Sequence, residues 1–188
     1  MSEVYFMPLW IILSYCIIAV LCIFSIVKLF TTEKKFYAKS ALSTYIFYTI
    51  IFLAVWIFKI AVPAYTLFLT MLTILGACFF GHYLGGYTKS NTFDRYLHAF
   101  GAFSYSLLTY CILDDFVDTG SSVLFQAIFI FLVGNTLGVF FELIEMFHDR
   151  KKDEPKSQKG LQDTDMDMLF NLIGSFIAGV FAYFWLLQ

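Results

Sequence analysis

Residues 9–27 read LWIILSYCIIAVLCIFSIV, an apolar run of nineteen residues without a charged side chain. A helix needs about 20 such residues to cross roughly 30 Å of hydrocarbon. The run is continuous, whereas a strand of a membrane β-barrel alternates between apolar and polar residues. Because a helix satisfies its backbone hydrogen bonds internally, this stretch predicts a transmembrane helix.

The rest of the chain repeats this pattern. Six stretches are long enough to span a bilayer, at about 8–30, 41–62, 65–86, 95–113, 122–147 and 166–187. Of the 188 residues, 60% are hydrophobic and 14% are charged, against about half and a quarter in soluble domains. The sequence therefore predicts an all-α membrane protein, a polytopic bundle of six transmembrane helices that forms a single domain over residues 1–188.

The basic residues are unevenly distributed among the connections between these spans. All but Lys59 flank the first, third and fifth connections. They are Lys28, Lys34, Lys35, Lys39, Lys89, Arg95, Arg150, Lys151, Lys152, Lys156 and Lys159. The fourth connection is instead acidic, with Asp114, Asp115 and Asp118. The positive-inside rule then places the odd connections, including a loop at 148–162, in the cytoplasm and both termini outside.

Charge and cysteine usage exclude some classes of function. The formal net charge of −2 gives no electrostatic basis for binding nucleic acid, so we expect no such partner beside the lipid bilayer. The four cysteines lie inside predicted spans and lack the paired spacing of a zinc or redox motif. We therefore expect neither a disulfide nor a thiolate metal site.

Ionisable and polar side chains within the spans gather at the ends that the rule places in the cytoplasm. In chain order they are His82, Asp94, His98, Glu142, Glu145, His148, Asp149, Asp163, Asp167 and Asn171. Many are three or four residues apart, which puts them on one face of a helix. Ionisable groups at membrane depth almost always point inward, toward a partner, a cavity or an ion. The pattern predicts a polar pocket between the last three spans.

Simpler interpretations stay open for several of these residues. Asp94 and Asp163 open helices, where a carboxylate caps free backbone N–H groups. Capping does not explain the acids at the carboxyl end of the fifth span, because negative charge there opposes the helix dipole. A metal ion, a proton, His98 or a nearby arginine must compensate it. His82 and His148 can equally be interfacial side chains.

Small residues favour close packing of the same three spans. Gly134 and Gly138 form a G-x-x-x-G pair, and Gly101 and Gly174 lie on the neighbouring spans. Such spacing lets helix backbones approach one another. We therefore expect spans four, five and six to be in contact.

Three segments carry a resemblance to a known family. FDRYLHAFG at 93–101, FELIEMFHD at 141–149 and DTDMDMLFNLIG at 163–174 resemble the YjdF-like family of bacterial inner-membrane proteins, which has no established activity. The matching positions are Asp94, His98, Glu142, Glu145, Asp163, Thr164, Asp167, Met168 and Gly174. The last segment is also similar to VanZ-like proteins. The resemblance covers about residues 80–187 and implies a multi-pass protein of the bacterial inner (plasma) membrane.

The donor set favours one function among three. Carboxylates with imidazole suit a divalent metal, Mg²⁺, Mn²⁺, Zn²⁺ or Fe²⁺. The first hypothesis is a metal-dependent hydrolase acting on a lipid-linked or interfacial substrate. Its predicted ligands are Asp94, His98, Glu142, Asp163 and Asp167; its predicted catalytic acids are Glu145, as general base, and Glu142; the other pocket residues are His82, His148, Asp149 and Asn171. The alternatives are a cation- or proton-coupled transporter and a noncatalytic structural or interaction protein.

Overall fold

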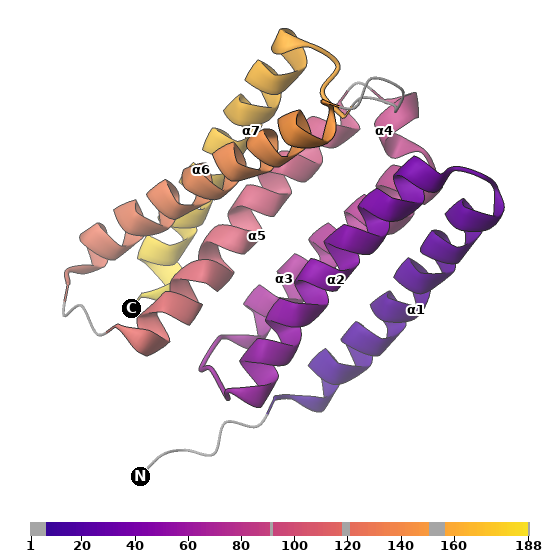
Figure 1. Ribbon diagram of the computed structural model, residues 1–188. Helices are drawn as coiled ribbons and strands as arrows, with labels where there is room; N and C mark the ends of the chain where they lie inside the picture. Colours follow the sequence, from indigo (N-terminus) through magenta and orange to yellow (C-terminus); the bar gives the residue numbers. More distant parts are fainter. Residues whose placement is uncertain (1–6, 91, 118–120, 151–156, 188) are drawn as a thin grey trace. The chain divides into compact units, whose positions relative to one another are not determined.

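A computed structural model describes residues 7–90, 92–117, 121–150 and 157–187 of the protein (Figure 1). Regular secondary structure in these residues is entirely helical, and six of the helical segments are long and apolar enough to cross a membrane. The predicted fold class, a six-span all-α membrane protein, is confirmed. Six charged residues of the predicted connections lie outside the described residues: Asp118, Lys151, Lys152, Asp153, Glu154 and Lys156.

The helices follow one another with short connections. The elements are α1 (Leu9–Thr31), α2 (Lys35–Ile57), α3 (Ala64–Leu75) with its π-helical continuation η1 (Gly76–Tyr83), α4 (Gly86–Lys89), α5 (Phe93–Phe116), α6 (Val123–His148) and α7 (Leu161–Phe181) with its π-helical continuation η2 (Ala182–Leu186). The six spanning segments are α1, α2, α3 with η1, α5, α6, and α7 with η2.

Some helix ends differ from the apolar stretches for local reasons. Helix α2 begins at Lys35 rather than near 41, because the chain reverses in a tight turn where Glu33 has a φ of 59°. Helix α7 begins at Leu161 rather than near 166, since acidic residues suit a first helical turn. Pro63 precedes α3, and its carbonyl accepts from the backbone N–H of Thr66 at 3.0 Å. Proline here ends a connection and does not kink a span.

The chain divides into two compact units. The first unit comprises Met1–Ser90 and Cys111–Asp118, and the second comprises Asn91–Tyr110 and Thr119–Gln188. In the first unit, the ring of Tyr15 on α1 stacks on Phe52 of α2 at 4.2 Å, and the buried Tyr48 hydroxyl donates to the Leu67 carbonyl of α3 at 3.1 Å. A ring stack thus joins α1 to α2, and a hydrogen bond joins α2 to α3. That the chain forms a single membrane domain stays a prediction.

Glycines bring α5, α6 and α7 together in the second unit. A Cβ at Gly134 of α6 would collide with Ser106 of α5 and Ser175 of α7, and one at Gly138 would lie 2.7 Å from Asn171. On α7, a Cβ at Gly174 would lie 2.7 Å from the backbone carbonyl carbon of Ala99 on α5. The expected contact of these three helices is therefore confirmed, and it places their polar faces against one another.

Candidate metal centre

His98 is the common neighbour of acids from two helices. Its Nε2 lies 3.6 Å from Oδ1 of Asp94, one turn earlier on α5, and 3.8 Å from Oε1 of Glu142 on α6. Its Nδ1 lies 3.3 Å from Oδ1 of Asn171 on α7. When Nδ1 donates to Asn171, Nε2 is the ring nitrogen that faces the acids. Histidines that bind metals are commonly oriented in this way.

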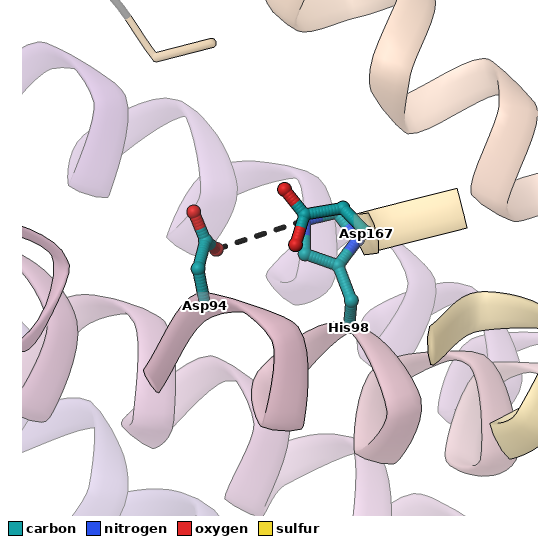
Figure 2. Close-up of side chains that lie close together, drawn as sticks. All are labelled: Asp94, His98 and Asp167. Carbon is teal, nitrogen blue, oxygen red and sulfur yellow. Dashed lines mark ion pairs between the residues drawn. The ribbon is translucent and has the colours of Figure 1, made fainter. Parts of the chain in front are cut away.

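Asp167 of α7 completes a group of three potential ligands. Asp94, His98 and Asp167 each offer one ligand atom, and these atoms lie within 4.8 Å of one another. Figure 2 shows the three side chains, with the His98–Asp94 ion pair dashed. Asp167 is only 2% exposed, and its Oδ1 has no hydrogen-bond partner in the described part of the chain. An unpaired buried carboxylate is costly, so it is expected to be protonated or to be neutralised by a cation.

The distances from His98 Nε2 to the two acids are longer than those of direct hydrogen bonds. Protein hydrogen bonds from nitrogen to oxygen span about 2.7–3.2 Å. Ligands about 2.1 Å from a tetrahedral metal lie about 3.4 Å from one another. The separations of 3.6 Å to Asp94 and 3.8 Å to Glu142 are closer to the second value.

The negative charges of the three buried acids around His98 also have to be balanced. Asp94, Glu142 and Asp167 are 8%, 5% and 2% exposed. A protonated His98 would offset only one of their three negative charges. Lys159 attracts Asp94 electrostatically, but no lysine or arginine among the described residues forms an ion pair with these three acids. Protonation of the acids or a bound cation would have to neutralise the remainder.

A short segment before α7 contacts the acids of α6. The backbone N–H groups of Ser157 and Gln158 donate to the two carboxylate oxygens of Asp149, each at 2.8 Å. The side-chain Nε2 of Gln158 donates to Oε2 and to the backbone carbonyl of Glu142, both at 3.1 Å. Glu142 Oε1 has no hydrogen-bond partner in the described chain and is left facing His98. Asp149, predicted to line the pocket, therefore anchors this segment.

The other acids predicted for the site take different positions. Asp163 accepts from the backbone N–H of Lys159, just before α7, at 3.1 Å. Its negative charge also acts on Asp94, Glu142 and Asp167. It is absent from the three-ligand group. Glu145 is half-buried one turn beyond Glu142, and the negative charges of Asp94 and Asp167 act on it.

The other two histidines lie on α6 and η1. His148, at the end of α6, is exposed. His82 belongs to the first unit and lies on η1, with ring centroids 4.8 Å from Tyr87 and 5.9 Å from Tyr37. Its Nδ1 is buried without a hydrogen-bond partner in the described residues.

The two arginines near the acids in the sequence, Arg95 and Arg150, form no ion pair with them in the described part of the chain. The guanidinium of Arg150 lies 4.5 Å from the ring centre of Phe147. Arg95 has a buried Nε without a hydrogen-bond partner among the described residues. Of the compensators considered from the sequence, His98 is the one that pairs with the acids within the described residues.

Gln158 is the residue of this site that sequence reasoning missed. Gln158 is an uncharged side chain in a polar connection, whereas most of the predicted site residues are ionisable groups within or next to apolar spans. Its proximity to α6 depends on the tertiary path of the chain after residue 156. The nearest sequence signal is its place just before the acid-rich start of α7.

Comparisons with known proteins place the chain among membrane proteins. A family model described as "Predicted membrane protein (DUF2238)" matches residues 10–188. A Thermotoga maritima protein with the printed name "Uncharacterized protein" is 31% identical over 103 residues, which cover 55% of this chain and 54% of that relative. The chain thus spans about half the length of the curated relative that it matches. No solved structure matches the chain.

Proposed function

From the premise that the chain belongs to the DUF2238 family of predicted membrane proteins, we propose that it is a metal-dependent hydrolase acting on a lipid-linked or interfacial substrate. Membership agrees with the YjdF-like resemblance in the sequence. The family description names no reaction, so the proposal depends on the site. One observation carries it: the buried Oδ1 of Asp167 lacks a hydrogen-bond partner in the described chain, beside Asp94 and His98.

The proposed ligands are Asp94, His98, Glu142 and Asp167. Their mixture of carboxylates and imidazole suits Mn²⁺, Fe²⁺ or Zn²⁺, and their oxygens also suit Mg²⁺. Such an ion would supply a nucleophile, because it makes a coordinated water acidic near neutral pH. Glu145, one turn from Glu142 and half-buried, is the proposed general base for that water.

The packing beyond the cluster favours hydrolysis over transport. A transporter needs a polar pathway that continues through the bundle. Here Gly134 brings α6 against Ser106 and Ser175, and both serine hydroxyls donate to carbonyls of their own helices, those of Ala102 and Asn171. The hydroxyl protons of both serines are used in hydrogen bonds within their own helices, so they do not continue a polar pathway from the cluster.

A purely structural role explains the cluster less well. Polar groups that only fix helix register are expected to pair with one another, since buried polar atoms without partners are costly. In the described residues, one oxygen of Asp167 and one of Glu142 lack hydrogen bonds. These carboxylate oxygens without hydrogen bonds favour a bound ligand over a purely structural role.

Substitution of Glu145 by Gln tests the hydrolase directly. We expect the variant to retain its metal and to lose activity by about 10²- to 10⁴-fold, because a general base contributes that much. The assay would measure phosphate and fatty acid released from a panel of phospholipids and polyprenyl phosphates in mixed micelles, with and without chelator. The exposed Asp165 provides the control Asp165→Asn. Chelator-resistant activity, or an unchanged Glu145→Gln rate, would refute the assignment.

The orientation in the membrane is a second part of the proposal. We expect the loop at 148–162 and the metal-binding end of α5–α7 to face the cytoplasm of a bacterial cell, with both termini outside, because basic residues flank the odd connections. Alkaline phosphatase fused after Gln188 should be active and green fluorescent protein there should be dark. Reporters placed within 148–162 should give the opposite pattern. The reverse result at both positions would invert the topology.

A further inference from the structure

We propose that Gln158 is a positioning residue that orients the Glu142 carboxylate for metal binding, and that Asp149 holds Gln158 in place. This inference rests on the proposed metal site and adds two residues to it. Neither residue is needed as a ligand. Each acts through hydrogen bonds to a neighbouring residue.

The first step is the attachment of Gln158 to α6. Asp149 follows the last turn of α6, and each of its carboxylate oxygens accepts one backbone N–H, from Ser157 and from Gln158, at 2.8 Å. Hydrogen bonds to an ionised carboxylate are about twice as strong as neutral ones. This two-point attachment fixes the backbone of residue 158 beside the helix end.

The second step is the contact with Glu142. Asp149 and Glu142 are seven residues apart, close to two helical turns, so both lie on one face of α6. Gln158 bridges them: its backbone is bound by Asp149, and its side-chain Nε2 reaches both the backbone carbonyl and Oε2 of Glu142 at 3.1 Å. One amide group thereby fixes the Glu142 side chain relative to its own helix.

The third step is the consequence for the metal-binding atoms. With Oε2 engaged by Gln158, Glu142 presents Oε1 toward His98, and this oxygen has no hydrogen-bond partner in the described chain. A carboxylate free to rotate would need to be ordered each time a metal binds. Hydrogen bonds to ligating carboxylates remove that cost, and their loss typically lowers metal affinity 10- to 100-fold.

The test compares Mn²⁺ affinity in the full-length protein in nanodiscs. We expect Gln158→Leu to weaken Mn²⁺ binding by about 10- to 100-fold, measured by calorimetric titration and by the electron paramagnetic resonance signal of free Mn²⁺. The matched control is Gln162→Leu, which removes an exposed glutamine from the first turn of α7. Asp149→Ala should also weaken binding, whereas Asp165→Ala should not.

A double-mutant cycle separates positioning from general stability. If Gln158 acts through Glu142, then Gln158→Leu should change Mn²⁺ affinity by less than about twofold in a Glu142→Gln background. A loss that persists undiminished there would overturn the proposal, as would equal affinities for Gln158→Leu and Gln162→Leu. If Gln158→Leu does not fold, Asp149→Ala in both backgrounds gives the same comparison. A wild-type protein that binds no metal would overturn the metal site itself.

Discussion

Replacement of Asp167 by Asn is expected to remove the divalent metal that we propose for the wild-type protein. Asn keeps the size of the side chain but removes its negative charge. Asp167 is 2% exposed and its Oδ1 has no hydrogen-bond partner in the described chain, so its charge is the one for which we expect the strongest need of a cation. Loss of a metal ligand should lower metal affinity by more than the roughly 100-fold that follows from loss of a residue hydrogen-bonded to a ligand. Elemental analysis of purified protein would measure the metal content, and titration with Mn²⁺ and Zn²⁺ would measure the affinity.

The control for this result lies two residues away. Asp165→Asn makes the same chemical change at an exposed position of α7, and we expect it to leave metal content unchanged. His98→Ala should reproduce the Asp167→Asn loss, because His98 lies in the same three-ligand group. Metal retained at full stoichiometry in both site variants, or absent from the wild type, would contradict the prediction.

Replacement of Gly174 by Ala is expected to destabilise the protein by about 1–3 kcal/mol, the usual cost of overpacking. The added Cβ would lie 2.7 Å from the carbonyl carbon and 2.9 Å from the Cα of Ala99. These are backbone atoms, so α5 and α7 would have to separate. Because Ala99 adjoins His98 and Asn171 is one turn from Gly174, the same separation should lengthen the His98–Asn171 contact of 3.3 Å. Metal affinity should therefore fall with stability.

Thermal unfolding in detergent and Mn²⁺ titration together would test this coupling. Ile173→Ala is the matched control: it alters the adjacent residue, whose side chain is 42% exposed, and should leave the metal affinity unchanged. A Gly174→Ala variant as stable as the wild type and with the same affinity would show that the helices are not held at this separation.

The number and nature of the spans could be predicted because each depends on local composition. Apolar runs of sufficient length specify membrane helices wherever they occur in the chain. Helix ends were less predictable. The start of α2 at Lys35 and that of α7 at Leu161 lie in polar segments, where capping and turn geometry decide the boundary and apolarity gives no signal.

The site was predictable in part, since helical spacing shows which side chains share a face. Spacing led to Asp94, His98, Glu142 and Asp167, all of which the structure places around one imidazole or in one ligand group. Spacing could not decide whether Asp163 caps a helix or faces the cluster, because both positions satisfy the same pattern. Helical spacing could not predict Gln158, because this residue lies in a connection, which has no helical periodicity.

The composition of the cluster also constrains how the protein is made. His98 on α5 and its partner Asn171 on α7 are 73 residues apart, so the ribosome delivers α5 to the membrane well before α7 exists. Until then Asp94 and His98 have no acceptor, donor or counterion from the later helices. Among the spans of the described chain α5 also has the lowest mean hydropathy. We therefore expect α5 to become stably placed in the bilayer only after α6 and α7 have emerged.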